Sequence, residues 1–147
     1  MKNTSSIKVF IVDDDLFCRE LYRQYLINMG VTDIQLFDNG QDCINELTQQ
    51  PDIILLDHQM APVDGLETLK KIKRFNPDIY LIFISGQENM QVAINALKYG
   101  AFDYVIKGGD NEAAIVAVVQ KVLTIMELLS RRGPDGKWNR LLSFFSF

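Results

Sequence analysis

Cysteine is scarce in this sequence, and an excess of basic residues is absent. The 147 residues include 2 cysteines, Cys18 and Cys43, and both fall within helix-like stretches. Buried thiols in a reducing cytosol are therefore expected rather than a disulfide or a metal site. The net charge is −4, so the chain lacks the basic face that phosphate neutralisation requires. No direct binding to nucleic acid is expected.

Long apolar runs, internal repeats and low-complexity stretches are also missing. The polar start, residues 1–6, contains no apolar signal region. No run approaches the roughly 20 apolar residues of a membrane-spanning helix. Hydrophobic residues make up 48% and charged residues 23% of the chain, which is typical of a globular domain with a sizeable core. A cytoplasmic protein is expected.

Short apolar runs alternate with longer amphipathic ones along the chain. The apolar runs predict five strands, at Ile7–Val12, Asp33–Phe37, Asp52–Leu56, Ile79–Ile84 and Tyr104–Ile106. Helical spacing predicts five helices, at Asp15–Met29, Gln41–Gln49, Asp64–Phe75, Glu88–Tyr99 and Asn111–Leu129. This alternation implies parallel strands joined by right-handed crossovers. The predicted fold class is α/β, with a doubly wound five-stranded parallel sheet covered on both faces.

Polar residues stand where the predicted strands end. The first strand runs into Asp13–Asp15, the third into Asp57, the fourth into Ser85 and the fifth into Lys107. Functional groups of a doubly wound sheet lie outside the carboxyl ends of its strands. We therefore expect at least three carboxylates, a hydroxyl and an ammonium at one edge.

This set of groups has a chemical logic. Clustered carboxylates raise one another's pKa unless a cation relieves them, and all-oxygen ligands around an open position favour Mg²⁺. Lys107 can pair with an incoming phosphate and Ser85 can donate a hydrogen bond to it. With the charge neutralised, Asp57 can attack phosphorus and form an acyl phosphate.

Each of these residues also has an ordinary structural explanation. Asp13–Asp15 can be a solvated N-cap cluster, in which Asp15 is the residue expected to cap the first helix. Lys107 can be a surface lysine, and Ser85 a turn or cap residue beside Gly86. The coincidence of all of them at four strand ends favours a phosphoryl-transfer site.

Four segments of the chain resemble the receiver domain of two-component response regulators. They are residues 9–15, residues 51–57 followed by Met60 and Asp64-Gly65, residues 83–86, and residues 96–107. The resemblance runs from about Ile7 to Leu129. It implies a flavodoxin-like sheet of order 2-1-3-4-5, as in CheY-like proteins, with five helices.

The resemblance also implies roles for individual residues. Asp57 would be the phosphoacceptor, and Asp13, Asp14 and the backbone carbonyl of Gln59 would complete a Mg²⁺ site with it. Ser85 would follow the phosphate and Lys107 would pair with it.

A further implied residue is Tyr104, which would change rotamer on phosphorylation. For Tyr104, a plain strand aromatic is the equal alternative. In the family, phosphorylation would also change the surface of the fourth helix, fifth strand and fifth helix. The implied partners are a sensor histidine kinase or phosphotransfer protein and a downstream protein target. A homodimer through this surface or through the C-terminal tail is a further expectation.

The sequence departs from the family pattern in the loops beside this site. Gly108-Gly109 stands where the family usually has a proline after the lysine, and Pro62 is displaced by one position in Met60-Ala61-Pro62. His58 and Gln59 occupy the loop that tunes dephosphorylation in the family, and His58 is expected to be a solvent-facing loop residue.

The chain after Leu129 has a different composition. We expect a receiver domain over residues 1–130 and a basic, apolar tail over residues 131–147, with no output domain. The tail can pack on its own domain or a dimer mate, dock on a partner or membrane, or begin a longer protein; the first is favoured.

The chain is therefore predicted to be a signalling switch that catalyses only its own phosphorylation and dephosphorylation. One alternative is an aspartyl phosphohydrolase on a similar fold, which usually has a second Asp where this chain has Gln59. The other is a degenerate receiver that binds partners without phosphorylation.

Overall fold

The computed structural model describes residues 4–58, 64–86, 90–108 and 111–131. Its strands are β1 (Lys8–Val12), β2 (Asp33–Phe37), β3 (Ile53–Asp57), β4 (Tyr80–Ser85) and β5 (Asp103–Ile106). Its α-helices are α1 (Leu16–Asn28), α2 (Gly40–Asn45), α3 (Gly65–Phe75), α4 (Met90–Lys98) and α5 (Asn111–Ser130), and two 3-10 turns are η1 (Thr4–Ser6) and η2 (Leu47–Gln49). These elements follow the predicted order.

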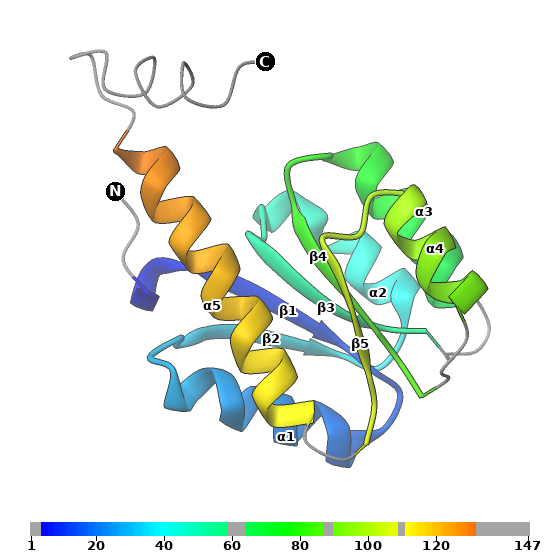
Figure 1. The fold of residues 1–147 in the computed structure, drawn as a ribbon, viewed down its shortest axis with the longest axis horizontal. Coiled ribbons are helices and arrows are strands. Elements are labelled where there is room, and N and C mark those ends of the chain that lie inside the picture. The colour runs from blue at the N-terminus through cyan, green and yellow to red at the C-terminus, as the bar shows by residue number, and fades with distance from the viewer. Residues whose placement is uncertain (1–3, 59–63, 87–89, 109–110, 132–147) are drawn as a thin grey trace.

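The five strands form one sheet of order β2-β1-β3-β4-β5, and every pair is parallel. This confirms the predicted fold class. All five residues of β3 are buried, as expected for a central strand of a sheet that is covered on both faces. The carboxyl ends of the strands meet at one edge, at the lower right of Figure 1.

Two hydrophobic clusters lie on the two faces of the sheet. One joins alternate residues of β1, such as Val9 and Ile11, to buried side chains of α1 and α5. The other joins Phe10 and Val12 to α2, α3 and α4. The alternation follows from the two-residue period of a strand. Figure 1 shows the same layers, with α1 and α5 on one side and α2, α3 and α4 on the other.

Some helix boundaries differ from the sequence expectation. The predicted helix Gln41–Gln49 ends at Asn45 and is followed by η2, after which Gln50 has a φ of 59°. This left-handed residue turns the chain toward Pro51 and β3. The helix predicted from Asp64 begins at Gly65 because Asp64 is its N-cap, whose carboxylate accepts the N–H of Glu67 at 2.9 Å.

The two cysteines are free thiols, with Cys43 buried and Cys18 half-buried.

Two expectations, one about a side chain and one about the length of an apolar segment, need correction. Helical spacing puts Phe75 on the same side of α3 as Leu69 and Ile72, which are buried, yet Phe75 is 55% exposed at the last position of the helix. No segment was expected to approach membrane-spanning length, yet α5 is long and apolar enough by length and composition, with a mean hydropathy of 1.8 over 18 of its 20 residues.

Core helices of globular proteins can be as long and as apolar as a membrane-spanning helix. The polar residues Glu112, Lys121 and Glu127 interrupt the apolar run of α5 in the sequence. In the fold, Ile115, Val119 and Val122 are buried in the hydrophobic cluster on the α1 and α5 face of the sheet. Helix α5 therefore forms part of the domain core.

Candidate functional site

Three strand ends bring charged side chains into contact at one edge of the sheet. Asp13 directly follows β1, Asp57 ends β3 and Lys107 directly follows β5. The Nζ atom of Lys107 lies 2.9 Å from Oδ1 of Asp57 and 3.0 Å from Oδ2 of Asp13. Asp13 is 0% and Asp57 is 2% exposed. One ammonium thus pairs with two buried carboxylates.

The backbone of Lys107 is fixed by the neighbouring strand. Its N–H donates to the carbonyl oxygen of Ser85 at 2.7 Å, which continues the pairing of Ser85 with Ile106 at the ends of β4 and β5. Ser85 itself is completely buried. The hydroxyl-bearing residue predicted for this edge therefore lies beside the lysine.

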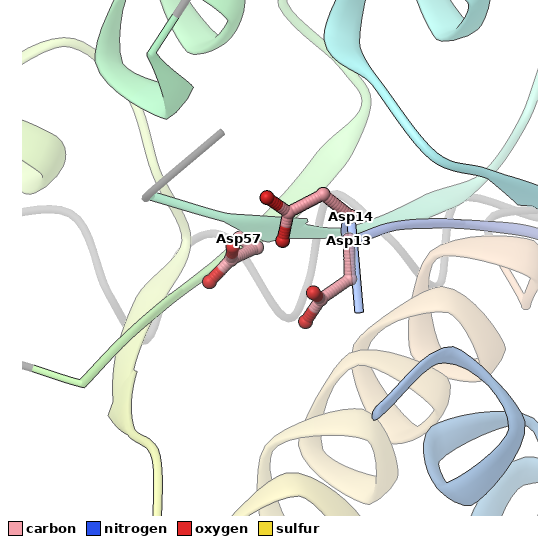
Figure 2. Close-up of side chains that lie close together, drawn as sticks. All are labelled: Asp13, Asp14 and Asp57. Atoms are coloured by element: carbon pink, nitrogen blue, oxygen red, sulfur yellow. The ribbon is translucent and has the colours of Figure 1, made fainter. Parts of the chain in front are cut away.

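The three consecutive aspartates occupy different positions. Asp15 is the N-cap of α1, where its carboxylate accepts the N–H groups of Phe17 and Cys18, so the expectation that Asp15 caps this helix is confirmed. Asp13 points into the site, and its Oδ1 accepts the N–H of Asp15 at 2.9 Å. Asp14 is exposed, and its carboxylate lies beside those of Asp13 and Asp57 in Figure 2.

Burial changes the protonation equilibria of this group. It raises the pKa of Asp57 to about 6 from 3.8, and the hydrogen bond from Lys107 opposes that rise. The pKa of Asp13 is also raised by burial. Burial acts to lower the pKa of Lys107, but Asp57 and Asp13 outweigh it and the pKa is raised. The lysine is therefore held as an ammonium.

The carboxylates are arranged in a way that suits a hard cation. One oxygen from each of Asp13, Asp14 and Asp57 lies within 4.8 Å of the others. Oδ2 of Asp57 is buried and has no hydrogen-bond donor among the described residues. Buried carboxylate oxygens without donors are costly, and Mg²⁺ is bound by such oxygens together with waters. The donor set therefore fits Mg²⁺. The predicted carbonyl ligand, Gln59, lies outside the described residues.

Two residues that support the site were not predicted as site residues. Arg19 donates from Nη1 to the carbonyl oxygen of Asp13 at 2.7 Å and so fixes the chain where β1 ends. Gly65 packs against β3: a Cβ there would lie 2.5 Å from the carbonyl oxygen of Asp57. A close approach of α3 to β3 therefore requires glycine. The role of Arg19 could have been predicted from its position four residues after the N-cap, about one helical turn from the end of β1.

A row of aromatic rings connects this edge to β5. The ring of His58 lies 5.3 Å from that of Phe83, and Phe83 lies 6.2 Å from Tyr104 at an interplanar angle of 24°. His58 is half-buried, and its Nδ1 is a buried atom with no hydrogen-bond partner among the described residues. The expectation of a solvent-facing His58 is therefore wrong, because its ring packs on Phe83.

The two unusual loops are only partly described. The loop with Met60, Ala61 and the displaced Pro62 lies outside the described residues, as does Gly109. Gly108 has a φ of +97°, a conformation that glycine adopts without strain and proline cannot. The chain after Lys107 therefore follows a path that the usual family proline would not allow.

Comparison with known proteins agrees with this geometry. The family model of the response regulator receiver domain matches residues 9–130. The chain belongs to this family of two-component signalling domains, whose members act in phosphorelays.

Two curated relatives illustrate the match. Luminescence regulatory protein LuxO of Vibrio campbellii (strain ATCC BAA-1116) is 29% identical over 130 residues, which cover 88% of this chain and 28% of LuxO. The DNA-binding transcriptional regulator NtrC of Escherichia coli (strain K12) is 34% identical over 117 residues, which cover 79% of this chain and 24% of NtrC. The chain thus spans about a quarter of these relatives.

Solved structures match the fold as well. A chain of the CheX–CheY–BeF₃–Mg²⁺ complex from Borrelia burgdorferi superimposes with a TM-score of 0.72 at 26% identity, covering 82% of this chain and 90% of that one. The BeF₃-activated DrrB receiver domain gives a TM-score of 0.73 at 24% identity, covering 80% of this chain and 97% of that domain.

Proposed function

We propose that this protein is a phosphoacceptor switch, in which Asp57 receives a phosphoryl group from a sensor histidine kinase or a phosphotransfer protein. The observation that carries the proposal is the contact of Lys107 Nζ with Asp57 at 2.9 Å and Asp13 at 3.0 Å. An ammonium between two buried carboxylates at the carboxyl ends of parallel strands suits the binding of a phosphoryl group.

Each residue has a separate part in this reaction. A carboxylate oxygen of Asp57 forms the new bond to phosphorus while the bond from phosphorus to the donor breaks and the donor leaves with its electron pair. Lys107 then exchanges its carboxylate contacts for phosphate oxygens, and Ser85 donates to another of them. Phosphoryl transfer needs mainly such positioning and charge neutralisation.

Asp13, Asp14 and Asp57, with the carbonyl of Gln59, would hold Mg²⁺ at this site. The ion supplies positive charge that offsets the phosphate and the clustered carboxylates. The fit rests on the three carboxylates, whose oxygens lie within 4.8 Å of one another, and on Oδ2 of Asp57, which has no donor in the described part of the chain.

The phosphorylated state would be read at the surface of α4, β5 and α5. Ser85 moves toward the phosphate and Tyr104 changes its position beside Phe83. Apolar side chains are available for a protein partner or a homodimer on this surface, since Met90 is 76% and Ile106 is 41% exposed. Phosphorylation biases a conformational equilibrium that already exists.

The remaining assignments follow from this function. We assign the receiver domain to residues 1–130 and the segment 131–147 to an appended tail, place the protein in the cytoplasm, and expect no catalysis beyond its own phosphorylation and dephosphorylation. Protein partners, rather than nucleic acid, are expected for this acidic chain, which has a net charge of −4.

Binding of beryllofluoride, a phosphoryl mimic, tests the proposal. Wild-type protein should show a rise in Tm with BeF₃⁻ and Mg²⁺ together that exceeds the rise with either alone, because the mimic binds only the folded site. Asp57→Asn should show no such synergy, whereas Glu20→Gln, a change on the exposed face of α1, should keep it. The absence of synergy in the wild type would instead favour a receiver that acts without phosphorylation.

A further inference from the structure

A groove lies at the opposite edge of the sheet from the phosphorylation site. It has a volume of about 1180 Å³ and is walled by the amino ends of β4 and β5 and by the last turn of α5. In Figure 1, β4 and β5 begin in the upper part of the picture, and the last turn of α5, drawn in orange, lies at the upper left. Small-ligand sites usually have volumes of ~300–1,000 Å³, so this groove has room for several side chains of a peptide segment.

One wall of the groove is apolar, and polar side chains, two of them acidic, line much of the rest. Tyr80 and Phe102 meet edge to face at 5.5 Å, and Met126 and Leu129 approach them from α5. Leu129 is 39% exposed at the end of its helix. An apolar wall next to open solvent gains free energy when a partner covers it.

The charges on this rim favour a basic partner. The carboxylates of Asp52 and Asp78 lie along it with one ammonium, that of Lys73. Lys73 donates to the carbonyl oxygens of Pro77 and Ile79 at 2.6 and 2.8 Å. Asp52 is also engaged, since its Oδ2 accepts the N–H of Lys8 at 2.9 Å. Two carboxylates against one ammonium still leave the rim with a net negative charge.

We propose that residues 132–147 of this chain dock in this groove. The segment carries three basic residues against one acidic residue, although the whole chain has a net charge of −4. Its large apolar residues suit the one apolar wall: Trp138, Leu141, Leu142, Phe144, Phe145 and Phe147. Both its charge and its apolar content are therefore complementary to the groove.

The point of attachment strengthens this assignment. Leu129 and Ser130 line the groove, so residue 132 follows its wall by two positions. A short tether of this kind gives an effective concentration in the millimolar range, which favours docking within one chain over docking between chains. The proposal does not depend on phosphorylation of Asp57, because the groove lies at the other end of the strands.

The only tryptophan of the chain, Trp138, provides the test on the full 147-residue protein. Docking predicts a blue-shifted emission and severalfold weaker quenching by acrylamide than for a free indole, and neither should change with protein concentration. Leu129→Glu and Asp78→Lys, both at exposed positions of the groove, should each shift the emission to the red and increase quenching. Circular dichroism spectra and Tm values would check that the variants remain folded.

A matched control is Leu97→Glu, which changes a 50% exposed leucine on α4 and should leave Trp138 protected. Loss of protection in this control rather than in the groove variants would place the segment on α4 and overturn the proposal. Protection that grows with protein concentration would indicate a second copy, and protection found only with anionic lipid vesicles would indicate a membrane. A wild-type Trp138 that is fully open to acrylamide would also refute docking.

Discussion

Replacing Asp57 by asparagine should stabilise the protein, and increasingly so as the pH rises. The carboxylate is 2% exposed, and burial raises its pKa from 3.8 to about 6. Between these values the folded state binds more protons than the unfolded state, so stability that is present below pH 3.8 is lost as the pH rises through 6. The full loss amounts to about 3 kcal/mol above pH 7.

The dependence on pH separates this effect from other consequences of the substitution. With the same two pKa values, the stability gain of Asp57→Asn should be larger at pH 7.5 than at pH 5 by roughly 1 kcal/mol. Urea denaturation of the wild type and variant at both pH values, without Mg²⁺, measures this difference. Adding Mg²⁺ at pH 7.5 should reduce the stability gain of Asp57→Asn. The cation offsets the charge of the Asp57 carboxylate, which only the wild type has.

Glu20→Gln removes an exposed carboxylate of α1 and controls for the change in net charge. A gain for Asp57→Asn that is equal at both pH values would refute the reasoning, and so would a gain that shrinks as the pH rises. Either result would mean that the ionised Asp57 is not the costly species in the folded protein.

Three further substitutions test other parts of the account. Gly65→Ala places a Cβ 2.5 Å from the carbonyl oxygen of Asp57 and should cost about 1–3 kcal/mol in urea denaturation, whereas Gly86→Ala, with no atom within 4 Å of its Cβ, should cost far less; equal costs would contradict the close approach. Lys107→Met leaves two buried carboxylates without a counter-charge and should lower stability at pH 7.5 by about 2 kcal/mol. This cost is smaller than for a fully buried ion pair because the lysine is partly exposed. An increase in stability would show that the ion pair is not needed. Asp15→Ala removes the N-cap of α1 and should cost about 1 kcal/mol in thermal denaturation, and no loss would argue against capping.

The sequence was sufficient to predict the sheet because β1, β3 and β4 are nearly continuous apolar runs. The apolar run of residues 53–56 favours burial on both faces of the sheet, which requires helices on both sides. Alternation of strands and helices then fixed the parallel connections. The charged residues at the strand ends were predictable for the same reason, since parallel strands bring their carboxyl ends to one edge.

Other features depended on contacts that no local pattern records. Helical spacing puts Phe75 on the same side of α3 as Leu69 and Ile72, but its ring is 55% exposed. No local pattern could show that the ring of His58, the residue after β3, packs on Phe83 of β4, because the two residues lie far apart in the sequence. The sequence did not predict Arg19 and Gly65 as parts of the site. Both contact the backbone of site residues, Asp13 and Asp57, and such contacts have no side-chain pattern in the sequence.

The most direct test of the central claim is the mass of the intact protein after incubation with acetyl phosphate. The account predicts that the wild type gains one phosphoryl group, that the gain requires Mg²⁺, and that peptide mapping places it on Asp57. Asp57→Asn should gain none under the same conditions. Equal labelling of the variant and the wild type, or no labelling of the wild type with Mg²⁺ present, would contradict the claim that Asp57 is the phosphoacceptor.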